Sequence, residues 1–196
     1  MRAFLETSRL TLRPFAESDA DDLLALDNDP EVMRYLNGGR PTTHEEVLRD
    51  TMPALLRHYP CLDGRPGVEG RGYWAAQDRG SGVFLGWFEF RPLRADSRDQ
   101  VELGYRLGRR AWGHGLATEG SRALIRLGFT ELGVLRVRAH TMTVNERSRR
   151  VMEKAGLRYV RTFFEEWPDA IDGSEFGDVE YAVTRQQWLE GRRGAD

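Results

Sequence analysis

Cysteine, lysine and long apolar runs are nearly absent from this sequence of 196 residues. The single cysteine, Cys61, excludes an internal disulfide and a cysteine metal cluster, and we expect no metal site. No convincing histidine partner stands near Cys61, so we expect a small loop or core residue and not a nucleophile. No segment approaches the roughly 20 apolar residues that cross a bilayer, and the first residues lack the apolar run of a signal peptide. We therefore expect a cytoplasmic protein that binds no membrane.

A strong excess of one charge is also lacking, since the formal net charge of the chain is only −2. An acidic total, without aromatic and basic residues interleaved on one face, argues against a nucleic-acid binder. The length suits one domain with a proper core, and neither an internal repeat nor a linker divides it. We therefore expect residues 1–196 to form a single domain, as a monomer or a homodimer.

The most informative stretch reads as a strand, a glycine turn and a helix. Residues 101–107 alternate at the two-residue period of a half-buried strand, Gly113 and Gly115 follow, and small and apolar residues recur at helical spacing from Leu116. Glycines let backbone N–H groups converge, and the positive end of the helix dipole adds to them. Residues 106–154 carry 11 Arg or Lys against 4 Glu. The stretch therefore predicts a site for a phosphate of a polyanionic ligand.

Two common phosphate loops do not fit this turn. The dinucleotide fingerprint needs a third glycine where Thr118 stands, and an acidic residue about 20 positions later that residues 134–140 do not supply. The nucleoside-triphosphate loop needs Gly-Lys-Ser/Thr, yet the only lysine is Lys154. Neither ligand is therefore expected.

Two motifs together resemble a known family. Arg110-x-x-Gly113-x-Gly115 resembles the Arg/Gln-x-x-Gly-x-Gly/Ala pyrophosphate loop of the GNAT N-acetyltransferases. Residues 145–157, which open with Asn145-x-x-Ser148, resemble the Asn-x-x-Ser helix and closing Gly-Phe of that family, in the same order and spacing. Leucine replaces the usual aromatic residue at the end of this second motif, which we expect to change only packing.

The beginning of the chain narrows the resemblance. Residues 5–14 and 28–36 are similar to the opening of the branch that contains the ribosomal-protein N-terminal (Rim-type) acetyltransferases. The resemblance implies an α/β (α+β) GNAT fold, with a mixed, mostly antiparallel sheet of six to seven strands flanked by helices. It also implies a cofactor cleft between the fourth and fifth strands, which on this sequence are residues 101–107 and 134–140.

The implied activity is N-acetyl transfer from acetyl-CoA to a primary amine, directly within a ternary complex. The residues that the resemblance assigns to acetyl-CoA are Leu107, Arg109, Arg110, Gly113, His114, Gly115, Leu116, Ala117, Thr118, Asn145 and Ser148. A rival interpretation is a non-catalytic module that binds acyl-CoA as a sensor or partner-binding protein.

Two residues are candidates for the chemistry. Glu102 stands on the central strand beside Gly104, and the resemblance makes it the base; the alternative is a structural carboxylate paired with an arginine. The resemblance makes Ser148 the proton donor to the departing sulfur, although first-turn capping, with Asn145 as the N-cap, would also explain its position. Tyr105 and Tyr159 are the next donors to consider. Neither His114 nor His140 is expected to be a base.

The remaining elements follow from periodicity and turn signals. We expect strands at residues 9–13, 158–165 and 179–183, and a hairpin that joins 73–76 to 83–90. We expect helices at residues 18–26, 31–36 and 43–58, the last kinked at Pro53 with Val47, Leu48, Leu55 and Leu56 inward. Leu135 should lie on one face of the strand at residues 134–140 with Val137 and Ala139, and residues 186–191 should be a polar tail.

The acceptor stays open among small amines and protein N-terminal amines. An insertion-like piece at residues 61–72 falls where the resemblance places one wall of the acceptor pocket. Residues 165–180 carry seven acids and no base, and the resemblance places this connection at the acceptor mouth. We expect these acids to attract a cationic acceptor, although a solvated turn is the plainer interpretation of a charge run.

Overall fold

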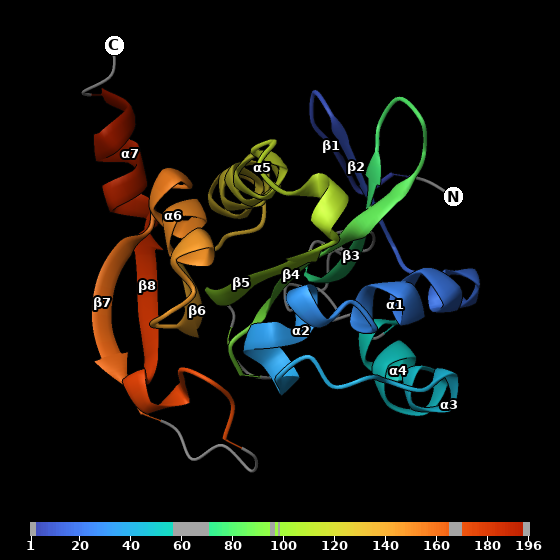
Figure 1. Cartoon of the computed structure of the whole chain (residues 1–196). Helices are drawn as coiled ribbons and strands as arrows, with labels where there is room; N and C mark the ends of the chain where they lie inside the picture. The colour runs from blue at the N-terminus through green and yellow to red at the C-terminus, as the bar shows by residue number, and fades with distance from the viewer. Residues whose placement is uncertain (1–2, 57–70, 95–96, 98, 165–169, 194–196) are drawn as a thin grey trace.

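One mixed sheet forms the centre of the molecule. The computed structural model describes residues 3–56, 71–94, 97, 99–164 and 170–193 (Figure 1). Within these residues the sheet has eight strands in the order β1-β2-β3-β4-β5-β6-β8-β7. The strands are β1 Leu5–Glu6, β2 Leu10–Arg13, β3 Gly72–Asp78, β4 Phe84–Pro92, β5 Gln100–Leu107, β6 Arg136–Met142, β7 Arg158–Phe163 and β8 Asp178–Thr184.

The sheet opens between β5 and β6. All other neighbouring strands pair antiparallel, but β5 and β6 are parallel and pair only from Gln100↔Arg136 to Glu102↔Arg138. Beyond this point β5 follows β4 to Leu107 and β6 follows β8 to Met142. We call the divergence beyond Glu102 and Arg138 the β5–β6 opening. Beyond this point no strand among the described residues pairs with the β6-facing edge of β5.

Helices cover the two faces unequally (Figure 1). They are α1 Ala20–Asp27, α2 Pro30–Asn37, α3 His44–Glu46, α4 Met52–Leu55, α5 Leu116–Thr130, α6 Glu146–Lys154 and α7 Arg185–Arg193. The larger apolar core joins the sheet to α5 and α6, and a second core joins β3 and β4 to α1 and α4. Among the described helices, none has the length and apolar character needed to span a membrane.

The α5 helix lies unusually close to β4. A Cβ atom at Gly120 would stand 2.3 Å from the ring of Phe88, and one at Gly128 would stand 2.6 Å from the ring of Phe90. Because the rings occupy the space of these missing side chains, α5 is held at a fixed height over the sheet. Its N-terminus is thereby placed at the end of β5.

The predicted fold class is confirmed, including the hairpin of β3 and β4 and the strand, turn and helix around β5. Eight strands replace the six to seven expected, because Leu5–Glu6 pairs with Leu12 and Thr11 as an additional short strand. Two residues are too few for a periodic pattern. The predicted cleft between the fourth and fifth strands therefore corresponds to the β5–β6 opening.

The helix expected at residues 43–58 is present over residues 44–55, but it is not α-helical throughout. Thr43 and Glu46 form a capping box at its start, and residues Val47–Thr51 adopt a wider π turn before α4. Pro53 lacks an N–H group, and the wide turn replaces a simple kink. Val47 and Leu55 are buried as expected, whereas Leu48 is 48% exposed. Residues 57–70 lie outside the described residues. This range includes Cys61 and most of the insertion-like piece at residues 61–72.

Two further expectations were wrong. Leu135 is 48% exposed because it precedes β6 and does not take part in the alternation that buries Val137 and Ala139. The expected polar tail is the helix α7, which begins where Thr184 Oγ1 accepts a 3.2 Å hydrogen bond from Gln187 N. The ring of Trp188 lies 5.6 Å from that of Phe129 in α5. This aromatic contact packs α7 against the core.

Candidate active site

The glycine turn presents backbone donors at the start of α5. Gly113 and Gly115 have φ angles of 78° and 76°, a left-handed conformation that costs other residues about 1–2 kcal/mol. Glu119 N donates to Gly115 O at 3.0 Å, so the N–H groups of residues 116–118 have no acceptor within the helix. A Cβ at Gly113 would meet no atom within 4 Å. The turn is thus open, and its amides can bind an anion.

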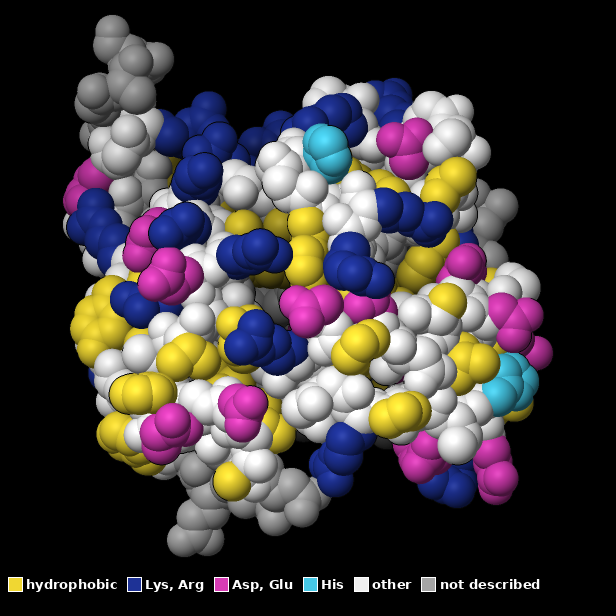
Figure 2. Space-filling model, in the orientation of Figure 1, with side chains coloured by type: hydrophobic (Ala, Val, Ile, Leu, Met, Phe, Trp, Pro, Cys, Tyr) yellow, Lys and Arg dark blue, Asp and Glu magenta, His cyan; other side chains and the backbone are white. Residues whose placement is uncertain are grey.

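The arginines of the turn hold it to other elements. Arg109 Nε lies 2.6 Å from Asp29 Oδ2 at the start of α2, and Arg110 donates to the carbonyl oxygen of Phe84. We expected both side chains to add charge at the turn; in the structure their guanidinium groups brace it. In Figure 2, Lys and Arg side chains gather above the middle of the face, in the region of the turn and of α5 and α6.

Glu119 clamps the chain's first hairpin onto the same turn. Its carboxylate accepts from Thr7 Oγ1 at 2.6 Å, Ser8 Oγ at 2.9 Å and Arg9 N at 3.0 Å. Arg9 also donates to His114 O at 2.8 Å and pairs with Glu119 at 2.6 Å. Burial raises the pKa of Glu119, but these hydrogen bonds outweigh it and lower the pKa to about 2. The clamp was not foreseen, because it joins residues 110 positions apart.

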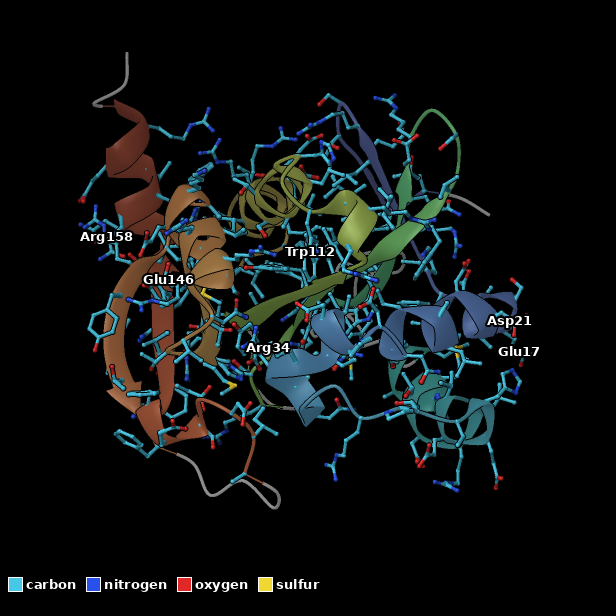
Figure 3. The ribbon with its side chains drawn as sticks, in the orientation of Figure 1. Glu17, Asp21, Arg34, Trp112, Glu146 and Arg158 are labelled. Atoms are coloured by element: carbon cyan, nitrogen blue, oxygen red, sulfur yellow. The ribbon has the colours of Figure 1, made fainter. Side chains whose placement is uncertain are left out.

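A tryptophan joins the turn to α6. Trp112 Nε1 donates to Leu107 O at 2.7 Å, and the guanidinium of Arg147 lies 5.3 Å from the Trp112 ring. Figure 3 labels Trp112 on the turn and Glu146 at the first position of α6. The turn and the start of α6 therefore face each other across the β5–β6 opening.

Hydroxyl groups lie on the α6 side of this opening. Tyr105 Oη is 2.9 Å from Ser148 Oγ and donates to Ser148 O at 3.1 Å. Asn145 is the N-cap as expected: its side chain accepts from Ser148 N at 3.2 Å and donates to Thr141 Oγ1 at 3.1 Å. Burial raises the pKa of Tyr105 to about 12, so its hydroxyl stays protonated at neutral pH. Tyr159 is 54% exposed on β7 and bonds to Thr162.

Glu102 lies on the opposite face, where β5 and β6 separate. Its Oε2 is 2.7 Å from Arg91 Nη2, and its Oε1 is 2.7 Å from His140 Nδ1. Burial raises the pKa of Glu102, but the hydrogen bond and charge of His140, together with Arg91 and Arg138, hold it below its usual range. Glu102 is thus ionised and paired at neutral pH.

The space beside Gly104 is filled by Glu89. A Cβ at Gly104 would stand 2.7 Å from Glu89 Oε2, and Glu89 Oε1 is ion-paired with Arg91. Burial keeps the pKa of Glu89 above its usual value; Arg91 opposes this shift and the charge of Glu102 adds to it. One carboxylate, Glu89, one arginine, Arg91, and one histidine, His140, are therefore packed around Glu102, the residue expected to be the base.

The β7–β8 connection reaches α2 on this side. A Cβ at Gly38, after α2, would meet Ile171 Cγ2 at 3.1 Å, while Asp172 and Glu175 are exposed. Glu180 is 3% exposed and pairs with three arginines, Arg136, Arg138 and Arg161. Its charge is neutralised, so fewer than seven acids act on the solvent here. Glu165, Glu166 and Asp169 lie outside the described residues.

The predicted site residues fall into three groups around the β5–β6 opening: the turn amides, the Ser148 and Tyr105 hydroxyls, and Glu102. Sequence reasoning set aside His140, which the structure places against Glu102. The two-residue period of the strand places residue 140 on the same face as Arg138. The register between β5 and β6, which brings His140 to Glu102, could not be predicted from the sequence.

The donor set fits coenzyme A: free helix N-terminal amides for the pyrophosphate, an unpaired strand edge for the amide-bearing arm, and hydroxyls for the sulfur. Such an arrangement defines a coenzyme A-dependent acyltransferase. Residues 9–158 match the model of the acetyltransferase (GNAT) domain, and the chain belongs to this family. It is an acetyl-CoA-dependent N-acetyltransferase.

Known proteins agree with this assignment. The chain is 36% identical over 191 residues to the FsC-acetyl coenzyme A-N(2)-transacetylase of Aspergillus fumigatus, covering 94% of this chain and 77% of that protein. Its fold is similar to the RimL ribosomal L7/L12 α-N-protein acetyltransferase in complex with coenzyme A, with a TM-score of 0.74, 17% identity, and 93% and 98% of the two chains covered. The fold is also similar to that of spermidine N-acetyltransferase from Vibrio cholerae in complex with coenzyme A and spermine. The TM-score is 0.72 at 17% identity, and the match covers 93% of this chain and 99% of that chain.

Proposed function

We propose that this chain acetylates a primary amine by direct transfer within a ternary complex. The observation that carries the proposal is the β5–β6 opening, with anion-binding amides at one end, hydroxyls on the α6 face and an ionised carboxylate on the other face. Direct transfer needs the donor and the acceptor to meet in one place. The opening gives each a separate side of the sheet from which to approach.

Each group has a proposed task. The amides of residues 113–118 bind the pyrophosphate of acetyl-CoA, and Asn145 contacts the arm that follows it. Backbone N–H groups on the unpaired edge of β5, near Arg106 and Leu107, stabilise the oxyanion. Ser148, supported by Tyr105, protonates the departing sulfur, and the proton of the acceptor ammonium leaves through the Glu102 site.

The acceptor is proposed to be a cationic amine. Asp172 and Glu175 are exposed on the connection that approaches α2, and a negative rim concentrates positively charged ligands. The relatives are named for an N(2) transfer, for spermidine and for a ribosomal protein's α-amine, so their names support an amine and leave its carrier open. Whether a small amine or a protein N-terminus is acetylated follows from the experiment below.

The test is thiol release from acetyl-CoA over a panel of small amines, polyamines and N-terminal peptides, in matched cationic and uncharged versions. We expect release with a subset of primary amines, and a KM for cationic acceptors that rises several-fold in the double variant Asp172→Asn/Glu175→Gln, while the KM for acetyl-CoA stays unchanged. An unchanged acceptor KM would reject the steering role. Saturable coenzyme binding without release from any amine would reject the acetyl transfer and favour a sensor.

A further inference from the structure

The surroundings of Glu102 do not suit the role of general base that the sequence resemblance implies for it. Glu102 is 11% exposed at its side chain, is paired with Arg91 and His140, and has a lowered pKa. A carboxylate that is ion-paired with Arg91 and hydrogen-bonded to His140 is a weak base, because taking a proton would disturb both contacts. His140 is 51% exposed at its side chain and contacts the same carboxylate.

From this geometry we infer that His140 Nε2 accepts the proton of the acceptor ammonium and that Glu102 is a positioning residue. The inference rests on the proposed acetyl transfer. Glu102 Oε1 lies 2.7 Å from Nδ1, and a carboxylate there fixes the proton on Nδ1. The lone pair of the neutral ring is then on Nε2. A carboxylate that sets the tautomer of a histidine base is a recurrent arrangement in enzymes.

The position of His140 suits this task. His140 lies two residues beyond Arg138, where β6 has parted from β5, so the Glu102–His140 contact bridges the narrow end of the opening. The ring also lies edge-on to Phe163 of β7, with 6.3 Å between centroids. It is therefore held from two sides and still half exposed on the face that α6 does not cover.

The proton balance of the reaction needs one group to accept a proton, His140, and one group to deliver a proton to the sulfur, Ser148. The acceptor nitrogen gives one proton to His140 before attack, then forms the new N–C bond to the acetyl carbon while the C–S bond breaks. Its second proton ends on the sulfur, through Ser148 on the other face of the sheet. His140 afterwards releases its proton to solvent, which its exposure allows.

Several charged groups share the sheet face of His140. The charged groups on this face include Glu89 and Arg91 of β4, Glu102 of β5, Arg136 and Arg138 of β6, Arg161 of β7, and Asp178 and Glu180 of β8. Most of these are paired with one another: Glu89 with Arg91, and Glu180 with both Arg138 and Arg161. A pH dependence that disappears only when His140 is replaced would therefore belong to His140.

The experiment compares His140→Gln, His140→Ala and Glu102→Gln by thiol release at saturating substrates. We expect His140→Gln and Glu102→Gln each to lower kcat about 10² to 10⁴ fold, the usual worth of a general base, with little change in the KM for acetyl-CoA. Wild-type kcat should rise with pH across the range in which histidines titrate, about pH 5 to 8, and the profile of His140→Gln should be flat. Added imidazole should restore part of the activity of His140→Ala.

The matched control is His44→Gln, which removes another exposed histidine next to a carboxylate, since His44 Nε2 lies 3.5 Å from Asp21 in a different part of the surface. Its kcat should stay within twofold of wild type. An active wild type with His140→Gln within threefold of it would overturn the inference and return the base to Glu102. Loss of activity in His140→Ala without rescue by imidazole would reduce His140 to a structural role. A wild type that acetylates no amine would contradict the proposed function itself.

Discussion

Glu119 shows how one side chain fixes the cofactor turn. It gathers hydrogen bonds from Thr7, Ser8 and Arg9, while Arg9 reaches on to His114 O within the turn. A carboxylate that accepts several hydrogen bonds in the folded state is stabilised in its charged form. The first hairpin therefore supports the turn although it lies outside the motif itself.

We predict that Glu119→Gln removes a pH-dependent part of the stability. The pKa of Glu119 falls from 4.5 to about 2 on folding, so its contribution is complete above the unfolded pKa and is lost as pH falls through the folded one. The unfolding free energies of wild type and Glu119→Gln should differ most above about pH 5 and converge near pH 2. Denaturant titrations across this range measure the difference, with Glu131→Gln at the exposed end of the same helix as control. A difference that does not vary with pH would contradict the clamp.

At the scale of elements, the strand, turn and helix around β5 were predictable because their signals are local. Alternation gave β5, and glycines followed by helical spacing gave the turn and α5. The helix α7 was missed because Trp188 packs against residues distant in the sequence, among them Phe129 of α5. The π turn before Pro53 was also missed, since a proline signals a break without specifying its geometry.

The conformation of the turn can be tested with alanine. Gly115 and Gly133 have φ angles of 76° and 69°, and a Cβ at either would meet no atom closer than 3.8 Å. Each substitution should cost about 1 kcal/mol of stability for the left-handed backbone. Only Gly115→Ala should raise the Kd for acetyl-CoA, measured by titration calorimetry, because Gly133 lies in the loop between α5 and β6. Equal affinities in the two variants would argue against phosphate binding at the turn.

For the whole molecule, the functional feature is the divergence of β5 from β6 within one sheet. Both strands were predictable from the sequence, as were the positions of Glu102 on β5 and of Ser148 on the helix that follows β6. The sequence could not give the register Glu102↔Arg138, which depends on packing of the whole sheet and which brings His140 to Glu102. For the same reason the pairing of Glu180 with three arginines was hidden within an acidic run.

The central claim is that acetyl-CoA binds at the glycine turn and extends into the β5–β6 opening. A crystal structure of the chain with coenzyme A tests it most directly. We expect pyrophosphate oxygens about 3 Å from the amide nitrogens of residues 113–118, and the sulfur between the two strands beside Ser148 and Tyr105. A coenzyme bound elsewhere, or a sulfur remote from Ser148 and Glu102, would contradict it.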